Sequence, residues 1–193
     1  ARIVTFVNQK GGVGKTTTAV SVSAALGRRG QRVLLVDLDP QANASSAAGI
    51  DGRELTGVYD ALLEEVPASE CIVRVPNDAF DLIPASAALA GAEVELVPAM
   101  ARERRLAAAL NPLRDRYDWI FIDCPPSLGL LTINALTASD SVVIPVQCEY
   151  MALEGLSRLM ETLELVRRAL NPGLSVLGVV LTMFDARTRL AQQ

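Results

Sequence analysis

The stretch Lys10-Gly11-Gly12-Val13-Gly14-Lys15-Thr16-Thr17 decides the fold, because it stands between a short apolar segment (3–7) and a helical segment (16–29). Three glycines let the backbone turn tightly enough to aim successive N–H groups at one anion. The N-terminal end of the following helix attracts the same charge. In such a loop Lys15 supplies a mobile cation and Thr16 a hydroxyl for magnesium. The stretch therefore predicts a strand, a phosphate-binding loop and a helix.

The loop departs from the common phosphate-loop pattern at its first positions. Gln9 stands five positions before Gly14, where the common pattern has glycine, and a second lysine, Lys10, opens the glycine run. From this position the Lys10 side chain would fold back with difficulty onto the phosphates that Lys15 serves. We hypothesise that Lys10 reaches a nucleotide held by a second subunit.

The composition narrows the class of protein. Half of the 193 residues are hydrophobic and only 4% are aromatic, which fits a Val, Ile, Leu and Ala core. The sequence contains no His, which excludes Ser-His-Asp and Cys-His catalysis and imidazole-rich metal sites. Cys71, Cys124 and Cys148 lack C-x-x-C spacing, so we expect buried thiols rather than disulfides or a zinc site.

Charge and hydropathy bear on the location of the protein. A net charge of −4 argues against a uniformly basic surface but leaves room for a local basic patch. The sequence has no apolar run long enough to span a bilayer, and it starts directly with a strand pattern rather than a leader. We therefore expect a cytoplasmic protein.

Apolar β-branched runs alternate with helical patterns along the chain. The strands expected to be buried on both faces are residues 3–7, 33–36, 119–122, 142–146 and 176–181. The expected helices are residues 16–29, 102–116, 130–138 and 153–170. Segments 72–75 and 81–83 could form edge strands. The alternation predicts the α/β class, a mostly parallel twisted sheet with helices on both faces, in a single domain spanning residues 1–193.

Three carboxylates follow expected strands, at the edge where open parallel sheets bind ligands. Asp123 ends an apolar run as a Walker B carboxylate does, and would hold magnesium beside Thr16, directly or through water. Asp39 is placed to orient or deprotonate a water in line with a terminal phosphate. For Asp37, structural support and direct function remain equally open.

At these residues the chain resembles the deviant-Walker-A group of P-loop NTPases, and within it the ParA/Soj chromosome and plasmid partitioning ATPases. The resemblance extends over essentially the whole chain. It rests on five blocks: Lys10–Thr17, Leu34–Asn43, Asp123–Leu128, Pro145–Tyr150 with Ala152–Gly155, and Leu181–Thr188.

The resemblance implies an ATPase with ATP and Mg²⁺ as cofactors, with Lys10, Lys15 and Asp39 as catalytic residues and Thr16 and Asp123 as metal ligands. It also implies that ATP drives a sandwich homodimer in which Lys10 of each subunit crosses to the phosphates of the other. Such dimers bind double-stranded DNA with little sequence preference. A ParB-like partner stimulates their slow hydrolysis, so the expected location is the nucleoid and the membrane is not a partner.

The resemblance further marks Arg187 and Arg189 as candidate DNA contacts. A second basic group, for which a solvated helix face is the more ordinary interpretation, consists of Arg102, Arg104, Arg105, Arg114 and Arg116. The family continues for some tens of residues past Gln193, including a segment near the adenine. We therefore expect this chain to lack the C-terminal segment of the family.

Three other functions remain open. A MinD-like membrane-associated positioning ATPase shares the loop, but that branch lacks the run Asp39-Pro40-Gln41 and needs a basic amphipathic C-terminal helix. A metabolic or redox relative, such as dethiobiotin synthetase or the nitrogenase iron protein, is a different class, and the latter needs two cluster cysteines per subunit. Cys124 stands directly beside the Walker B carboxylate. In a third view ATP is a switch that is barely turned over.

Overall fold

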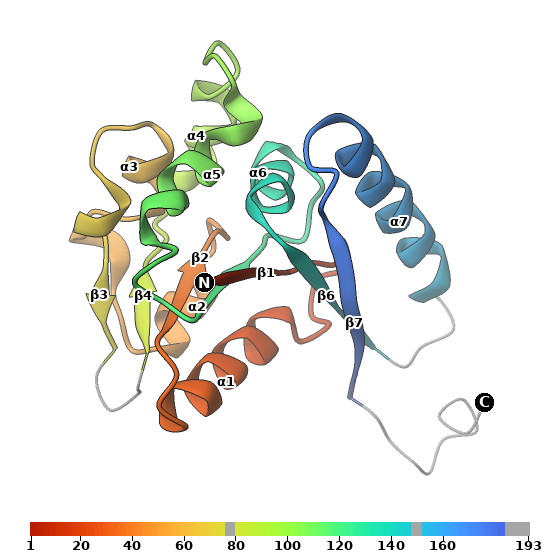
Figure 1. The fold of residues 1–193 in the computed structure, drawn as a ribbon, viewed down its shortest axis with the longest axis horizontal. Helices are drawn as coiled ribbons and strands as arrows, with labels where there is room; N and C mark the ends of the chain where they lie inside the picture. Colours follow the sequence, from red (N-terminus) through yellow and green to blue (C-terminus); the bar gives the residue numbers. More distant parts are fainter. Residues whose placement is uncertain (76–79, 148–151, 184–193) are drawn as a thin grey trace.

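The computed structural model describes residues 1–75, 80–147 and 152–183, with the backbone alone for 152–154, and shows a seven-stranded sheet between two layers of helices (Figure 1). The strands are β1 (Arg2–Phe6), β2 (Val33–Asp37), β3 (Val73–Arg74), β4 (Asp81–Ile83), β5 (Trp119–Asp123), β6 (Ser141–Gln147) and β7 (Ser175–Thr182). The α-helices are α1 (Lys15–Arg28), α2 (Asn43–Ala47), α3 (Val58–Leu62), α4 (Leu89–Glu95), α5 (Arg105–Leu110), α6 (Leu130–Ala138) and α7 (Ala152–Ala169). Short 3-10 helices span Gly52–Glu54, Ala68–Glu70, Arg102–Arg104 and Asn111–Leu113.

The strand order is β3-β4-β2-β5-β1-β6-β7, and every neighbouring pair is parallel except β3 with β4. The expected mostly parallel α/β sheet is confirmed. The chain leaves β1 toward β2, on the β3 side of the sheet. It leaves the neighbouring strand β5 toward β6, on the β7 side. In an open α/β sheet this reversal creates a crevice at the carboxyl ends of the two strands. The glycine-rich loop follows β1 at this place.

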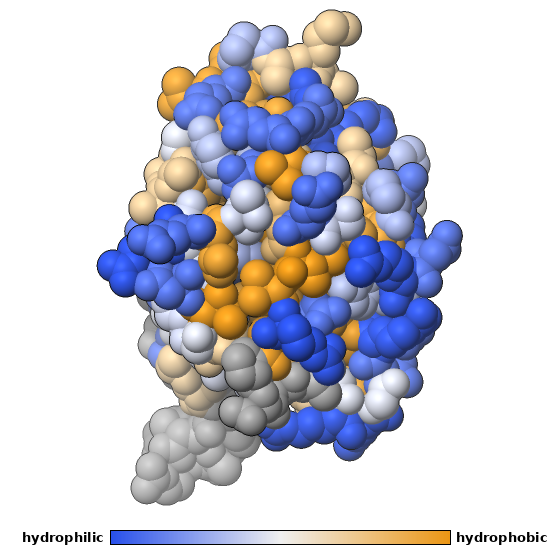
Figure 2. Space-filling model, turned by 90° about the vertical axis from the view of Figure 1, so that its left-hand side faces the viewer, coloured by the Kyte–Doolittle hydropathy of each residue, from blue (hydrophilic) through white to orange (hydrophobic). Residues whose placement is uncertain are grey.

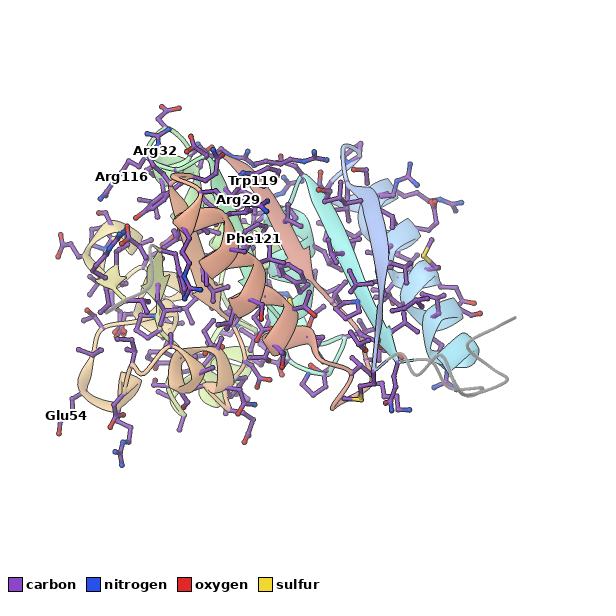
Figure 3. All side chains as sticks on the ribbon, turned by 90° about the horizontal axis from the view of Figure 1, so that it is seen from below. Arg29, Arg32, Glu54, Arg116, Trp119 and Phe121 are labelled. Carbon is purple, nitrogen blue, oxygen red and sulfur yellow. The ribbon has the colours of Figure 1, made fainter. Side chains whose placement is uncertain are left out.

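The two faces of the sheet carry separate cores, because successive strand residues point to opposite sides. Ile3 packs with the cluster under α3 to α6, whereas the next residue, Val4, belongs to the cluster under α1 and α2. On the α1 side the rings of Trp119 and Phe121 stack at 5.9 Å, close to α1 (Figure 3). A third cluster joins β6 to α6 and α7. The central strands are thus covered on both faces, as expected.

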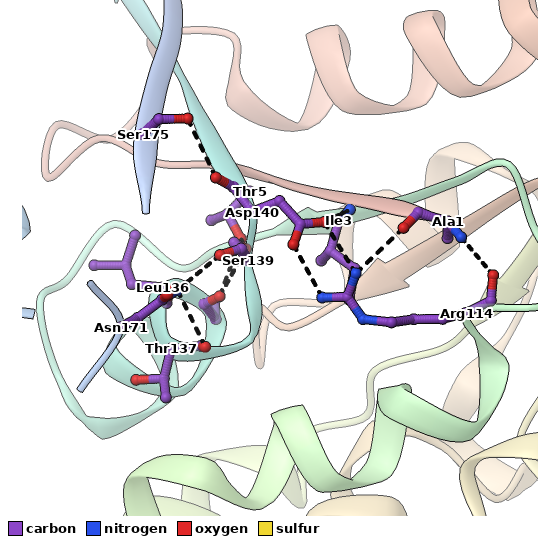
Figure 4. A network of polar contacts seen from close by, with 11 residues as sticks. Ala1, Ile3, Thr5, Arg114, Leu136, Thr137, Ser139, Asp140, Asn171 and Ser175 are labelled. Atoms are coloured by element: carbon purple, nitrogen blue, oxygen red, sulfur yellow. Dashed lines mark hydrogen bonds and ion pairs between the residues drawn. The ribbon is translucent and has the colours of Figure 1, made fainter. Parts of the chain in front are cut away.

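Polar contacts fasten the amino ends of the central strands (Figure 4). Arg114 donates two hydrogen bonds of 3.1 Å to the Asp140 carboxylate, which also accepts one from the Ile3 backbone at 2.7 Å. Asn171 donates to three carbonyls at the end of α6, including that of Ser139 at 2.7 Å. These contacts hold β1, β6 and α6 together at the edge opposite the glycine-rich loop.

The structure corrects three expectations. Strand β7 was expected to be buried on both faces, but it is the outermost strand, and five of its apolar residues are 37–59% exposed. Strand β4 lies between β3 and β2, so only β3 is an edge strand on that side. The helix expected at 102–116 is divided into a 3-10 turn, the short α5 and a second 3-10 turn. Pro112 explains the end of α5, because it has no N–H to continue the helical hydrogen bonds.

The β3 side of the molecule has mixed polarity. Figure 2 views this side, where hydrophobic side chains gather in a band between hydrophilic ones. A groove of about 280 Å³ lies between α3 and α5, bordered by the ion pair of Arg105 with Glu64. Cys71 and Cys124 are free and buried, as expected, whereas Cys148 is outside the described residues.

Within the described ranges, every helix is too short or too polar to cross a membrane.

Candidate phosphate-binding site

The glycine-rich loop turns from the end of β1 into the first residue of α1, Lys15. Gly12 and Gly14 have φ values of 73° and 81°, in the left-handed region that side chains other than glycine disfavour. Gly14 is the N-cap of α1, and it provides no side-chain cap for the helix. The first turn of α1 also lacks acidic residues. The N–H groups at this helix end are therefore available to an anion.

Asn8 holds the start of the loop in place. Its side-chain amide donates to the Pro145 carbonyl at 2.7 Å, and its oxygen accepts from the Lys10 N–H at 3.0 Å. The Lys10 carbonyl in turn accepts from the Lys15 ammonium at 3.2 Å. Asn8 was not singled out from the sequence, since its partner lies 137 residues away on β6. These contacts tie the start of the loop to β6 and to Lys15.

Lys15 lies inside the site, with only 6% of its surface exposed. Burial lowers the pKa of its ammonium, while the nearby carboxylates of Asp123 and Asp39 act in the opposite direction. A buried ammonium is stabilised when further negative charge lies close to it. The position of Lys15 therefore suits a phosphate that brings such charge.

Asp123 is a fully buried carboxylate at the end of β5, in register with Phe6 on β1 and Asp37 on β2. Burial raises its pKa to about 7, although the nearby Thr16 hydroxyl favours the ionised form. Neither carboxylate oxygen accepts a hydrogen bond of normal geometry from the described residues. An unpartnered buried carboxylate beside a hydroxyl fits a cation, since the cation would satisfy the oxygens that the protein leaves without donors.

The set of donors suits magnesium. The described residues contain no cluster of three or more His, Cys, Asp or Glu side chains that could hold a metal ion. Mg²⁺ needs no such cluster, because it keeps several waters and binds through one or two protein oxygens plus phosphate oxygens. Thr16 and Asp123 can supply those protein oxygens.

Asp37 and Asp39 have different surroundings although they are only two residues apart, Asp37 ending β2 and Asp39 following it. Asp37 is fully buried and accepts hydrogen bonds from the Ser45 N–H at 2.8 Å, the Ser45 hydroxyl at 2.7 Å and the Asp39 N–H at 3.2 Å. Burial raises its pKa to about 6, and these hydrogen bonds act against that rise. The geometry resolves the open question for Asp37: it anchors α2 and the loop before it.

Asp39 instead faces the site. It lines the same pocket as the glycine-rich loop and Lys15, and its Oδ1 accepts from the Gln41 N–H at 3.0 Å. Ala42, at the end of this turn, has a φ of 52°, so the backbone after Asp39 follows a constrained path. Asp39 keeps 7% of its surface exposed and lines the pocket, whereas Asp123 is fully buried and does not line it.

The pocket has a volume of about 550 Å³ and is open on one side. Its lining residues are Gly11, Gly12, Gly14, Lys15, Thr16, Thr17, Asp39, Gln41, Asn43, Ala47, Pro126 and Met183. Lys10 is exposed and does not line it. The pocket thus brings together Lys15, Asp39 and the expected loop residues except Val13, which is buried, and Asp123 and Lys10 are not among its lining residues. Five lining residues were not predicted as site residues from the sequence: Gln41, Asn43, Ala47, Pro126 and Met183.

Comparison with known proteins decides the family. Residues 1–176 match the family described as an AAA domain. The chain is 57% identical over 193 residues to the sporulation initiation inhibitor protein Soj of Bacillus subtilis, covering 76% of it. It is 54% identical over 193 residues to the chromosome partitioning protein ParA of Myxococcus xanthus, covering 68% of it. Both alignments use the whole of this chain. The chain belongs to the ParA/Soj family.

Solved structures share the fold. A structure from Mycobacterium smegmatis named cobyrinic acid a,c-diamide synthase, with bound ADP and magnesium, has a TM-score of 0.96 and 44% identity, covering the whole chain and 78% of that protein. A plasmid partition protein from Borrelia burgdorferi has a TM-score of 0.85 and 32% identity, covering 99% of the chain and 82% of that protein. ParA/Soj membership and the P-loop indicate a nucleotide-hydrolysing ATPase. The MinD-like alternative is not favoured.

The basic residues considered for ParA/Soj-type DNA contacts differ in their surroundings. Arg187 and Arg189 are outside the described residues. The second basic group forms contacts within the molecule rather than one solvated helix face. Arg102 pairs with Glu103, Arg105 with Glu64 and Arg114 with Asp140, and Arg104 donates to the Leu170 carbonyl. Arg116 lies with Arg32 at the amino edge of the sheet (Figure 3).

Proposed function

We propose that this protein is a DNA-partitioning ATPase in which Mg-ATP drives formation of a sandwich dimer. The dimer binds double-stranded DNA without sequence preference, and slow hydrolysis, stimulated by a ParB-like partner, separates it. The observation that carries the proposal is the separation of two lysines, with Lys15 buried inside the pocket and Lys10 exposed outside it. One subunit thus has a lysine for its own phosphates and a second lysine for another subunit.

The open side of the pocket supports a second subunit there. Gly11 and Gly12 are exposed, and a Cβ added at either would meet no atom of this chain within 4 Å. The backbone of another subunit could therefore approach the phosphates closely at these glycines. Lys10 next to them would then reach across to the partner's nucleotide. Enclosure of the phosphates by both subunits would exclude water and strengthen each charge contact.

The pocket residues divide the chemistry between them. Lys15 and the N–H groups of the loop bind the phosphates, and Thr16 and Asp123 would hold Mg²⁺. The bound metal would neutralise charge that develops on the phosphates during hydrolysis. Asp39 orients or deprotonates the attacking water, because its carboxylate faces the pocket and is not required by the metal. The names of the relatives support chromosome and plasmid partition as the setting for this ATPase.

DNA and the protein activator complete the proposal. Arg187 and Arg189 are the proposed DNA contacts, and the nucleoid is the proposed location. Since the whole chain carries a net charge of −4, DNA binding has to come from a local basic surface. A dimer would present such a surface twice, which links ATP binding to DNA affinity.

The test compares Lys10→Ala with Lys15→Ala. We expect Lys10→Ala to keep ADP affinity within about twofold of the parent, because Lys10 is not among the residues that line its own pocket. We expect Lys15→Ala to weaken ADP binding about tenfold to a hundredfold, the loss of a charge-assisted hydrogen bond. Titration with ADP measures both.

Dimer formation is measured by sizing chromatography with light scattering, in ATP and magnesium. The parent protein should dimerise with ATP and remain monomeric with ADP, and Lys10→Ala should fail to hydrolyse ATP. Equal loss of ADP affinity in the two variants would contradict separate roles for the lysines. Full-speed hydrolysis by the parent as a monomer, at a rate per subunit that does not change with concentration, would contradict the dimer.

A further inference from the structure

Thr182, the last residue of β7, contacts the phosphate loop from the outermost strand of the sheet. Its hydroxyl donates a hydrogen bond of 2.8 Å to the carbonyl of Val13, 169 residues earlier. Val13 is almost fully buried, and Thr182 is partly buried. The bond therefore joins the edge strand to the loop between Gly12 and Gly14.

This bond fixes the direction of one peptide unit of the loop. The described residues contain no cis peptide bond, so the carbonyl of Val13 and the N–H of Gly14 point to opposite sides of their shared peptide plane. With the carbonyl held toward Thr182, the Gly14 N–H points away from β7. The next carbonyl, that of Gly14, is held as well, by the Thr18 N–H at 2.9 Å and the Thr18 hydroxyl at 2.7 Å.

The orientation of these carbonyls matters for an anion. A phosphate-binding loop works because its N–H groups converge on the phosphate, and a carbonyl oxygen turned inward would repel it. Gly14 makes such a turn easy, since glycine adopts left-handed and right-handed conformations at similar energy. Gly14 here has a φ of 81°, and a conformational change would have to break the Thr182 bond.

Packing adds to the hydrogen bond. A Cβ built on Gly14 would lie 3.4 Å from the Thr182 methyl group, so this side chain covers the loop at the glycine where α1 begins. The residue after Thr182, Met183, lines the pocket. The end of β7 therefore forms one wall of the site, although the strand itself is mostly exposed.

We propose that Thr182 is a positioning residue for phosphate binding: its hydroxyl holds the Val13–Gly14 peptide with the N–H directed to the nucleotide and the carbonyl away from it. This inference deepens the proposed function by assigning it a residue outside the glycine-rich motif. The role concerns binding of phosphate by one subunit. It does not depend on whether two subunits associate or whether DNA is bound.

The experiment compares Thr182→Val, which keeps the shape and removes the hydroxyl, with Thr182→Ser, which keeps the hydroxyl and removes the methyl. ADP affinity is measured by calorimetry with magnesium, and the melting temperature of each nucleotide-free variant is measured alongside. We expect Thr182→Val to bind ADP about tenfold more weakly than the parent, the effect of about one hydrogen bond. We expect Thr182→Ser to bind ADP nearly as well as the parent.

Two results would overturn the proposal. One is unchanged ADP affinity in Thr182→Val, and the other is an equal loss in Thr182→Val and Thr182→Ser, which would assign the effect to the methyl group. ADP is used because the proposed dimer requires ATP. A failure of the Lys10 experiment therefore leaves this test intact, and a failure here leaves the Lys10 experiment intact.

A second measurement uses the unaltered protein, in case Thr182→Val does not fold. The backbone is labelled with ¹⁵N-glycine, and the amide signal of Gly14 is followed by NMR while pyrophosphate is added. We expect a large downfield proton shift at Gly14, as for an N–H that donates to a phosphate oxygen. Saturable pyrophosphate binding without a shift at Gly14 would overturn the proposal.

Discussion

Asp37 and Asp123 lie opposite each other on the adjacent strands β2 and β5, and their carboxylates are satisfied in opposite ways. Asp37 accepts three hydrogen bonds, whereas Asp123 accepts none of normal geometry from the described residues. Both are fully buried. The hydrogen-bonding capacity of Asp37 is satisfied within the protein, whereas the oxygens of Asp123 could accept contacts from a ligand. This contrast gives Asp37 a structural role and supports the proposed metal-binding role of Asp123.

The stability of the nucleotide-free protein should depend on the ionisation of Asp123. The folded protein holds this proton up to a pKa of about 7, whereas the unfolded chain releases it near 3.8. The contribution to folding is therefore fully present below pH 3.8 and is lost as the pH rises to about 7. Asp37, with a pKa of about 6, acts in the same direction over a narrower range.

Asp123→Asn should remove the Asp123 part of this dependence. Between pH 5 and pH 8, we expect the unfolding free energy of the parent to fall relative to that of Asp123→Asn by roughly 2 kcal/mol. Urea unfolding at both pH values, without nucleotide or magnesium, measures the difference. Parallel pH profiles for the two proteins would show that Asp123 is ionised at both pH values.

Ser45→Ala should destabilise the fold by removing a donor from Asp37. The substitution leaves a buried carboxylate with one fewer hydrogen bond and removes the acceptor of the Ala85 N–H. We expect a loss of about 1–3 kcal/mol in unfolding free energy. The matched control is Ser46→Ala, since Ser46 is exposed on the same helix and should change stability by less than about 0.5 kcal/mol. Equal stability of the two variants would contradict the anchoring role of Asp37.

Asp39→Ala should accumulate the ATP-bound dimer. The carboxylate is proposed to activate water, so its loss should slow hydrolysis by about 100-fold or more while ATP binding and assembly remain. Sizing chromatography with ATP and magnesium, together with phosphate release, provides both measurements. Glu54→Ala serves as a control for removal of one carboxylate, because Glu54 is exposed and far from the loop (Figure 3). A variant that is monomeric in ATP would contradict this role.

Gly11→Val should block dimerisation without straining the loop, whereas Gly12→Val should do both. Gly11 has no left-handed φ, and a Cβ there meets no atom of its own chain within 4 Å. We expect Gly11→Val to fold and still bind ADP, with an affinity that titration compares with that of the parent, and to remain monomeric in ATP. Gly12→Val should also strain the loop, since a side chain in the left-handed region costs about 1–2 kcal/mol. ATP-dependent dimerisation of Gly11→Val would show that the surface at Gly11 and Gly12 is not the dimer interface.

Arg187→Glu should weaken DNA binding and leave ATP hydrolysis in the absence of DNA unchanged. Loss of one phosphate contact should reduce the slope of log affinity against log salt by about one. The measurement is retardation of a non-specific duplex at several salt concentrations. Arg116→Glu makes the same change of charge at the amino edge of the sheet and should have a small effect (Figure 3). Equal effects of the two substitutions would indicate a response to net charge only.

The sequence predicted local features of the site better than contacts between distant segments. The glycine-rich run fixed the position of the loop, and the apolar runs before Asp37 and Asp123 fixed the ends of their strands. These features depend on neighbouring residues. The different burial of Asp37 and Asp39 could not be read from their spacing, because it depends on where Ser45 folds back onto β2. The contact of Thr182 with Val13 depends on which strand ends beside the loop.

The exposure of β7 could not be predicted from the sequence either, for a related reason. An alternation of Val and Leu with Gly178 looks the same in a central strand and in an outer one. Strand order alone decides the difference, and strand order follows from how the chain crosses the sheet. The break in the helix expected at 102–116 could have been predicted from Pro112, since proline disrupts the hydrogen bonding of a helix interior.

Strand β7 also affects how solution experiments on this chain should be interpreted. Along one side it pairs with β6, and its apolar side chains meet water. An outer strand of this kind is a template for self-association through backbone pairing. Two molecules joined in this way would remain together in the absence of ATP. They would separate when the sample is diluted or a mild denaturant is added. Assemblies that persist in a buffer free of triphosphate are therefore not evidence for the ATP-driven dimer, and only the fraction added by ATP reports on the proposed interface at Gly11 and Gly12.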